Sequence, residues 1–361
     1  NDVILKSTLY KSLQKLNPKC SDEVLLLAID ELNRDRSLIS PIKANEEIYK
    51  ILKEGLSLSI QHEGKQEIKK VYFIDWIDVH NNDFLLVNQF WITGDLYTRR
   101  PDLIGFVNGI PLILFELKSP TEDILSGFND NIKDYKDTIP KLFNYNAFIV
   151  VSNGSKTRIG STFAGWEHYA EWKKINSEGE KGIISLDTVI KGTCSKERLL
   201  DIIENYILFI EEKGGLVKII SKYHQYFGVE NAIKTLGGTE KNNQRLGVFW
   251  HTQGSGKSVS MMIFSQKILR KIKGDWTFVI VTDRKELDKQ IYKNFVDAGI
   301  VTEKQAHAKN CIELENLLKQ NHRFIFTLIH KFQNQKKSLT NRKNIIVVVD
   351  EAHRTQYDSL A

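Results

Sequence analysis

Hydrophobic and polar positions change their spacing twice along the chain. Residues 1–60 carry apolar residues at helical spacing between charges, and SDEVLLLAIDELNR begins with Ser21 as a helix cap. From Val71 the apolar residues form dense runs typical of strands: VYFIDWIDV, FLLVNQFWI and PDLIGFVNGIPLILFELKSP. From about Ser195 helical and strand patterns alternate. The pattern therefore predicts an α/β protein with more than one domain.

The third strand-like run contains Asn108-Gly109 between apolar stretches, which is a strong hairpin signal. We expect a helix from Ile124 to Thr138, because Pro140 prevents its continuation, and then a buried strand in NAFIVVSNG. This order of elements predicts a mixed sheet flanked by helices.

The second half of the chain follows a polar stretch, EWKKINSEGEKG, which we interpret as a loop or linker. Expected helices are KERLLDIIENYILFI, KIISKYHQYF, VSMMIFSQKILRKI and RKELDKQIYKNF, and expected strands are LGVFW, TFVIVTD, RFIFTLIHKF and NIIVVVDEAH. Apolar strands separated by helices predict a parallel sheet buried on both faces. The predicted divisions are 1–170, a linker at 171–195, and 196–361.

Composition excludes several classes of protein. No apolar run approaches the ~18–20 residues of a membrane span, and the chain begins without a secretory signal pattern. Cys20, Cys194 and Cys311 lie too far apart for a disulfide framework or a CxxC metal knuckle. The formal charge of +6 is compatible with a polyanionic partner but does not identify one. We expect a cytoplasmic protein with no membrane partner.

The run LGVFW-HTQGSGKS followed by a helix has the order that a P-loop requires. Its glycines would let backbone N–H groups surround a phosphate chain, while the lysine would reach the β- and γ-phosphates and the last serine would bind Mg²⁺. The residues predicted to bind ATP here are Gly254, Ser255, Gly256, Lys257 and Ser258. His251 stands where the motif GxxxxGK[ST] has its first glycine.

A second polar pair, Asp350-Glu351, ends the apolar run NIIVVV. The carboxyl edge of a parallel sheet is where ligands bind in open α/β folds. Asp350 would hold Mg²⁺ through water, and Glu351 would orient and deprotonate the water that attacks the γ-phosphate. ATP and Mg²⁺ are therefore the expected cofactors.

The hairpin carries a different set of charges. Asp102 follows Pro101, and Glu116 and Lys118 lie two residues apart and so project from one face of a strand. Two carboxylates that hold Mg²⁺, with a lysine beside them, suit metal-assisted cleavage of a phosphodiester. The arrangement resembles the PD-(D/E)xK nuclease core. The alternative is an edge strand with a lysine that prevents aggregation and with exposed acids.

Turn geometry tests that interpretation. A strict two-residue turn at Asn108-Gly109 pairs Asp102 with Phe115, whereas Glu116 points to the opposite face from Phe115. A shared metal therefore requires a longer loop, a bulge or a strong twist near Pro101.

The following helix places Asn131 and Tyr135 four residues apart, on one face. The pair resembles the QxxxY element found beside such nuclease sites, with Asn131 where glutamine is expected. An ordinary amphipathic helix would also explain it.

GSGKS and DEAH together resemble motifs I and II of superfamily 2 helicases and translocases. VTDRKELDKQ resembles motif Ia, which implies that Asp283, Arg284 and Gln290 contact the DNA backbone, and TLIHKFQ resembles the next backbone-contacting segment. YHQYFGVENAI resembles the segment whose glutamine, here Gln225, reads adenine. A solvated helix start, an ordinary strand end and an amphipathic helix are the respective structural alternatives.

A nuclease followed by a motor lobe resembles the restriction (R, or motor) subunit of bacterial type I restriction–modification enzymes. The resemblance implies a PD-(D/E)xK domain and a first RecA-like lobe. It implies ATP-dependent translocation and Mg²⁺-dependent cleavage of double-stranded, foreign, unmethylated DNA, with methylase and specificity subunits as partners.

The family also has parts that we expect outside this sequence. The second lobe, with its arginine finger, and the C-terminal helical region would follow Ala361, so we expect a fragment that hydrolyses ATP poorly. An early nuclease-site acid has no clear match here, and Glu23 and Glu31 are expected to be surface charges.

Two other classes of function remain open on the sequence. The chain could be an ATP-dependent helicase whose first domain only binds DNA, or a nucleotide-switched scaffold that clamps DNA without catalysis. Proximity of Asp102, Glu116 and Lys118 would favour the nuclease, because neither alternative needs all three together.

Overall fold

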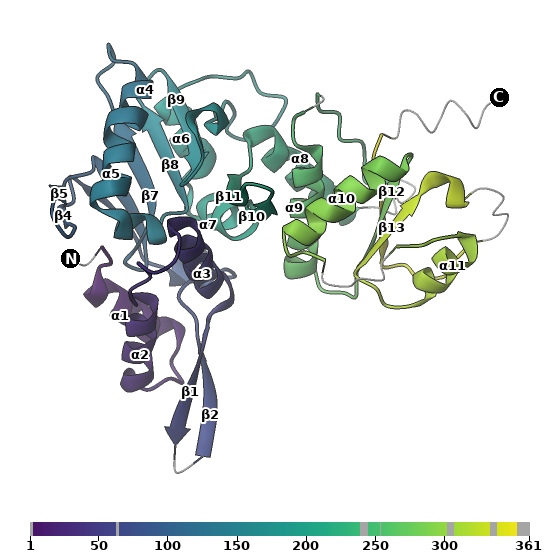
Figure 1. Ribbon diagram of the computed structural model, residues 1–361, viewed down its shortest axis with the longest axis horizontal. Helices are drawn as coiled ribbons and strands as arrows, with labels where there is room; N and C mark the ends of the chain where they lie inside the picture. Colours follow the sequence, from purple (N-terminus) through teal and green to yellow (C-terminus); the bar gives the residue numbers. More distant parts are fainter. Residues whose placement is uncertain are drawn as a thin grey trace. The chain divides into compact units, whose positions relative to one another are not determined.

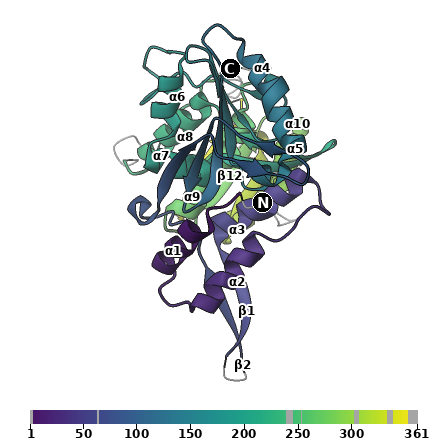
Figure 2. The same cartoon turned by 90° about the vertical axis from the view of Figure 1, so that its left-hand side faces the viewer.

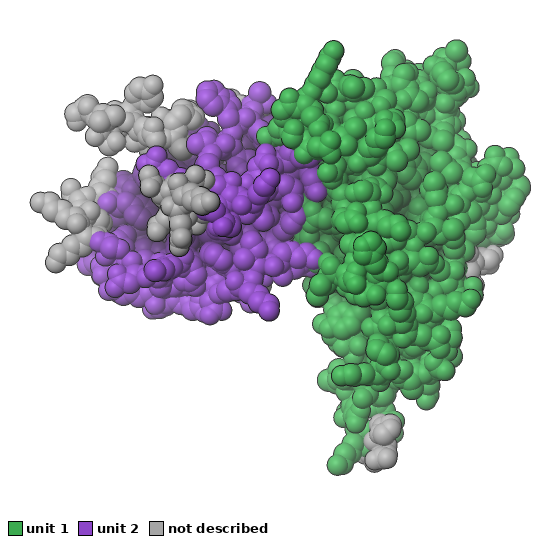
Figure 3. All heavy atoms as spheres, turned by 180° about the vertical axis from the view of Figure 1, so that it is seen from behind, with its two compact units in different colours: residues 1–209, 215–223 green, residues 210–214, 224–361 purple. Residues whose placement is uncertain are grey.

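The computed structural model describes residues 3–62, 65–238, 245–252, 254–301, 307–332 and 338–351. The chain forms two compact units, residues 1–209 with 215–223 and residues 210–214 with 224–361 (Figure 3). The first unit continues past the predicted linker at 171–195 and includes 196–209, which the sequence pattern predicts for the second domain. Tyr49 explains part of this, because its hydroxyl donates to the backbone oxygens of Ile203 and Ile207.

The first unit contains a mixed five-stranded sheet in the order β3-β6-β7-β8-β9, in which only β7 and β8 pair in parallel. Its strands are β3 (Phe84–Asn88), β6 (Leu103–Val107), β7 (Ile110–Leu117), β8 (Phe148–Ser152) and β9 (Thr157–Ser161). One face is covered by a continuous helical segment that consists of α4 (Ile124–Ser126), the π-helix η2 (Gly127–Ile132) and α5 (Lys133–Thr138) (Figures 1 and 2). The predicted mixed sheet is present, and the predicted helix has the expected ends.

Further elements surround this sheet. They are α1 (Lys6–Leu16), α2 (Asp22–Leu32), α3 (Pro41–Glu54), β1 (Leu56–His62), β2 (Lys65–Val71), η1 (Val79–Asn81), β4 (Ile92–Thr93), β5 (Thr98–Arg99), η3 (Pro140–Asn144), η4 (Trp166–His168), α6 (Leu186–Thr193), α7 (Lys196–Asn205), β10 (Ile207–Glu212) and β11 (Gly215–Ile220). The hairpin β1–β2 projects from the first unit (Figure 1).

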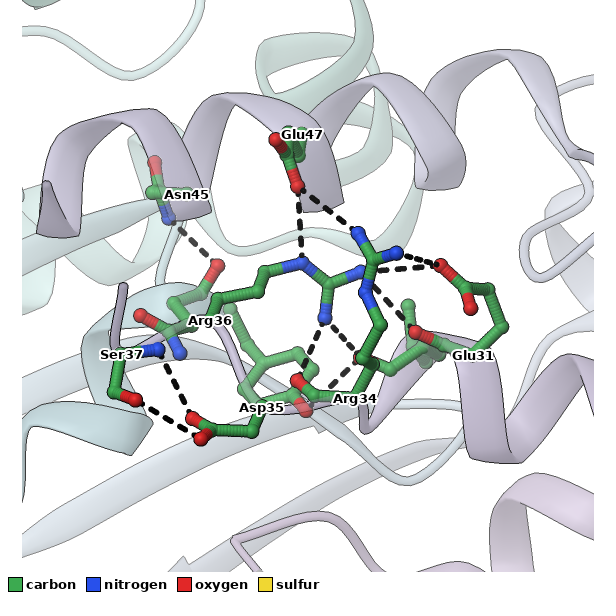
Figure 4. A network of polar contacts seen from close by, with 10 residues as sticks. Glu31, Arg34, Asp35, Arg36, Ser37, Asn45 and Glu47 are labelled. Atoms are coloured by element: carbon green, nitrogen blue, oxygen red, sulfur yellow. Dashed lines mark hydrogen bonds and ion pairs between the residues drawn. The ribbon is translucent and has the colours of Figure 1, made fainter. Parts of the chain in front are cut away.

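A buried arginine joins α2 to α3. The Arg36 side chain is 1% exposed; its guanidinium donates to the backbone oxygens of Leu32, Arg34 and Glu31 and to the Glu47 carboxylate, 3.2 Å away (Figure 4). A buried cation is tolerated only when its donors are satisfied, as they are here. On α3, Asn45 donates to the backbone oxygens of Phe143, Asn144 and Asn146, so the helices are held to the segment before β8.

Three predicted elements in this part of the chain are wrong, in whole or in part. VYFIDWIDV is mostly an irregular loop, because the Asp75 carboxylate accepts the N–H groups of Ile77 and Asp78 and so competes with strand pairing. The helix predicted over KERLLDIIENYILFI ends at Asn205, and the residues after it form the hairpin β10–β11, which also replaces the start of the helix predicted in KIISKYHQYF. The β-branched residues of these segments suit a strand.

The second unit contains a parallel three-stranded sheet in the order β13-β12-β14. Its elements are α8 (Tyr223–Leu236), α9 (Lys257–Lys271), β12 (Thr277–Thr282), α10 (Lys285–Asp297), α11 (Cys311–Lys319), β13 (Phe324–Leu328), η6 (Ile329–Phe332) and β14 (Ile345–Val349). All three strands pair in parallel, as predicted, and the central strand β12 is buried along its whole length. The predicted burial on both faces fails at β14, where Val347 and Val349 are 55% and 37% exposed.

The strand predicted in LGVFW is not formed. Residues 245–250 make no strand, Val248 and Trp250 are 84% and 92% exposed, and Gly247 has a φ of +130°, which interrupts an extended run. Among the described helices, none is long and apolar enough to cross a membrane.

Candidate functional site

The β6–β7 hairpin sets the alignment of the predicted nuclease residues. Asn108 and Gly109 have φ angles of 52° and 80°, as a tight two-residue hairpin turn requires. Phe106 pairs with Pro111 but Gly105 pairs with Ile113, so Leu112 is an extra residue in a β-bulge.

The bulge is one of the three solutions that the sequence left open. Beyond it, Leu103 pairs with Phe115, which places the preceding residue, Asp102, level with Glu116. Paired residues of neighbouring strands project to the same face. The two carboxylates therefore share one face of the sheet.

The side chains converge at the carboxyl end of β7. Asp102 Oδ2 accepts a hydrogen bond from the backbone N–H of Leu117 at 2.8 Å. Lys118 Nζ lies 3.5 Å from Glu116 Oε1 and donates to Asn131 Oδ1 at 2.7 Å. The structure thus brings together all of the residues predicted for the nuclease site, including Tyr135 from the helical segment.

Burial changes the acidity of this cluster. Glu116 is 1% exposed, and burial together with the charge of Asp102 raises its pKa to about 7, against the opposing effects of Lys118 and a hydrogen bond with Tyr135. Burial and the nearby Glu116 raise the pKa of the Tyr135 hydroxyl to about 12, so this hydroxyl stays protonated as a donor. Glu116 consequently exchanges its proton near neutral pH.

A glycine that sequence reasoning missed lets the helical segment approach the cluster. A Cβ at Gly127 would lie 3.2 Å from both Glu116 Cγ and Lys118 Cε, and 3.1 Å from Val151 Cγ1. Gly127 begins the π-helix, a distortion that is frequent at functional sites. The glycine within an otherwise helical pattern was the available signal.

The cluster suits a hard cation. Within the described part of the chain, no three or more His, Cys, Asp or Glu residues come together as a metal site. Asp102 and Glu116 supply two carboxylates, and the buried Glu116 Oε2 has no hydrogen-bond partner. Mg²⁺ is often held by one or two carboxylates while it keeps several waters, so the donor set fits this ion.

The glycine-rich loop begins α9. Gly254 and Gly256 have φ angles of 77° and 82°, in the left-handed region that favours glycine. Lys257 Nζ donates to the backbone oxygen of His251 at 3.2 Å. The loop thus has its lysine and its glycines as predicted for phosphate binding, on the N-terminal end of a helix.

Gln225, predicted to read adenine, is buried against this loop. Its amide donates to the backbone oxygens of Ser255 and Gly256, both at 3.1 Å. The hydroxyl oxygen of Ser255 is buried without a hydrogen-bond partner, and Ser258 is partly buried in the first turn of α9. Their roles with ATP stay predictions.

Asp350 and Glu351 follow β14, and Asp350 donates its N–H to the Val281 oxygen of β12 at 2.9 Å. Burial and the neighbouring Glu351 raise the pKa of Asp350, Lys257 lowers it and Asp283 raises it further. Glu351 has a φ of +54°, which is uncommon for a residue with a side chain. The loop lysine and the acidic pair therefore act on one another electrostatically.

Of the residues predicted to contact the DNA backbone, Asp283 lies with this group and its Oδ1 is buried without a partner. Arg284, 3.5 Å from Asp283, and Gln290 on α10 are exposed. Their predicted contacts with DNA remain predictions. In the predicted motif DEAH, Ala352 and His353 lie outside the described residues.

Comparison with known families assigns the two parts separately. Residues 1–168 match the model described as type I restriction enzyme R protein N terminus, and residues 224–361 match the SWI2/SNF2 ATPase model. The chain is therefore of the class that joins a restriction-enzyme R-protein domain to an ATPase domain.

Within that class, the chain belongs to the family of type I restriction enzyme endonuclease subunits. It is 36% identical, over 98% of its length, to the HindI endonuclease subunit of Haemophilus influenzae, and 32% identical over its whole length to the putative MjaIXP endonuclease subunit of Methanocaldococcus jannaschii. It spans 35% and 37% of the lengths of these relatives.

Proposed function

We propose that the first unit cleaves duplex DNA with Mg²⁺ and that the second unit contributes to ATP-driven DNA translocation. The observation that carries the nuclease proposal is the convergence of Asp102, Glu116 and Lys118 on one face of the sheet. Exposed ion pairs add only ~0–1 kcal/mol, and burying Glu116 beside a second acid is unfavourable, so stability does not explain the arrangement.

Each residue has a distinct role in the proposed cleavage. Asp102 and Glu116 would hold Mg²⁺, which supplies Lewis-acid polarisation of the scissile phosphate when bound. Lys118 would stabilise the negative charge that develops in the transition state. Asn131 fixes the position of the lysine ammonium, and the Tyr135 hydroxyl donates toward Glu116.

The second unit is proposed as the first RecA-like lobe of a superfamily 2 motor. The loop 254–258 would bind the phosphates of ATP, Ser258 and Asp350 would hold its Mg²⁺, and Glu351 would orient the attacking water. Gln225 would recognise the adenine of ATP. Contacts with the DNA backbone would come from Asp283, Arg284 and Gln290. Methylase and specificity subunits are the proposed partners, since the relatives are type I restriction enzyme subunits.

Nicking of supercoiled plasmid tests the nuclease proposal. We expect the chain to nick DNA with Mg²⁺ but not with EDTA, and Lys118→Ala to lower the rate at least tenfold because one charged group is lost from the transition state. Lys156→Ala, an exposed lysine just after β8, is the matched control and should nick at the original rate. Equal nicking by the Lys118→Ala variant would refute the proposed site.

A further inference from the structure

A small hairpin next to the nuclease cluster exposes three large apolar side chains. We define the aromatic hairpin as residues 89–100, which include β4 and β5. Within it, Trp91, Leu96 and Tyr97 are 65%, 85% and 53% exposed. Large exposed apolar side chains within one short segment are a feature of contact surfaces.

The aromatic hairpin is fixed to the first unit. A Cβ at Gly94 would clash with the backbone oxygen of Thr138, so only a glycine permits this approach to the end of α5. Arg99 forms an ion pair with Asp134 of α5, in which Nη2 donates to Oδ1 at 2.9 Å. The backbone that carries the exposed rings is therefore held against α5.

The second arginine has no such anchor. Arg100 is exposed, its guanidinium lies 5.1 Å from the centre of the Trp91 ring, and no carboxylate in the described part of the chain pairs with it. Arg99 lies at the same distance, 5.1 Å, from the Tyr97 ring. Asp95 is the one acidic residue of the aromatic hairpin. A cation beside exposed aromatic rings is a combination that binds the phosphates and the base faces of nucleic acid.

The chain runs directly from this hairpin into the cluster. Arg100 is followed by Pro101 and Asp102, and the backbone N–H of Gln89 donates to the backbone oxygen of Asp102 at 2.8 Å. A strand whose phosphate reaches Asp102 would thus pass beside Trp91 and Arg100.

We propose that the aromatic hairpin binds unpaired nucleotides of the DNA strand next to the phosphate that is cut. This inference rests on the proposed nuclease function. Base faces are covered by their neighbours inside a duplex, so an exposed ring stacks on bases only where the strand is unpaired. Arg100 holds a phosphate of the same strand, while Trp91 and Tyr97 supply the stacking surfaces.

Fluorescence anisotropy in EDTA tests this binding without cleavage, using a fluorescein-labelled single strand and the same sequence as a duplex. Stacking on one aromatic residue contributes enough that Trp91→Ala should weaken single-strand binding roughly 5- to 100-fold. Duplex binding should change much less, and Trp91→Phe should restore single-strand binding. Arg100→Ala should weaken binding and reduce its salt dependence by about one phosphate contact.

Tyr72→Ala is the matched control, because Tyr72 is 48% exposed with Lys70 Nζ 5.5 Å from its ring centre, outside the aromatic hairpin. It should bind both DNAs as the original chain does. Unchanged single-strand binding by Trp91→Ala, or an equal loss for strand and duplex, would overturn the inference. Since this assay needs no cleavage, its failure is separate from the failure of Lys118→Ala to lower nicking.

Discussion

At Glu116 the requirements of folding and of cation binding oppose each other. A carboxyl group that is 1% exposed beside a second acid keeps its proton up to a pH of about 7, whereas a cation needs the ionised form. Cation binding at this residue therefore releases a proton near neutral pH, and it should strengthen as the pH rises through 7.

The same residue predicts a pH dependence of stability. Its pKa rises from 4.5 in the unfolded chain to about 7 in the folded one, so the folded state binds this proton more tightly between these values. The free energy of unfolding should therefore fall as the pH rises from about 4.5 to about 7. Glu116→Gln removes this titrating proton. The free energy of unfolding of the variant, relative to that of the original chain, should therefore increase by up to about 3 kcal/mol between pH 5 and pH 8.

Urea unfolding in EDTA at both pH values measures the difference. Glu122→Gln, at an exposed position, is the control and should show no such gain. A difference between Glu116→Gln and the original chain that stays constant with pH would contradict the assignment.

At the scale of the element, the six-residue π-helix η2 decides how closely Asn131 and Tyr135 approach the cluster. Gly127→Val should force this segment away from Glu116 and Lys118, because even a Cβ there meets both side chains at 3.2 Å. We expect nicking to fall at least tenfold, with a loss of about 1–3 kcal/mol in stability.

Gly214→Val is the matched control, since a Cβ at Gly214 meets no atom within 4 Å. Nicking rates and thermal unfolding of both variants check the prediction. Full nicking activity in Gly127→Val would contradict this prediction, because it would show that the site does not need the close approach of η2 to Glu116 and Lys118.

Elements whose signal is local were predictable, and those decided by partners were not. The Asn108-Gly109 turn and the helix after the Gly-rich loop have the expected form, because glycine placement and apolar spacing determine them. The loop around Asp75 and the hairpin β10–β11 depend on side-chain hydrogen bonds and strand pairing that periodicity does not encode. Pro111 was an unused signal, because proline inside a strand is found at edges and bulges.

In the candidate nuclease site, too, local features were predictable and features that depend on distant residues were not. The three charged residues were proposed from their spacing and from the resemblance to a nuclease core, but the bulge at Leu112 that aligns them was one of several possibilities. Gly127 gave only a weak signal, since its importance comes from atoms of β7 and β8 that are distant in the sequence.

At the scale of the whole molecule, the two compact units hold the two proposed sites separately. Lys257→Ala should weaken binding of a fluorescent ATP analogue at least tenfold, because it removes the charge closest to the phosphates. Nicking measured without ATP should be unchanged, since the nuclease residues belong to the first unit. Lys273→Ala, exposed after α9, is the control for nucleotide binding. Loss of nicking in Lys257→Ala would show that the units do not act independently.

The order of the two parts was predictable from motifs, but the division between them was not. Residues 196–209 join the first unit through contacts such as Tyr49 with Ile207, which link segments far apart in the chain.

The bulge at Leu112 also determines which single-codon insertions or deletions in this hairpin keep the two acids aligned. Since the extra residue is absorbed between Pro111 and Ile113, loss of its codon would restore regular pairing and leave Asp102 level with Glu116. A codon lost or gained between the bulge and Glu116 would instead move one carboxylate to the other face. Relatives that differ by one residue in this hairpin should therefore carry the gap beside Leu112, and both acids should keep their alignment across it.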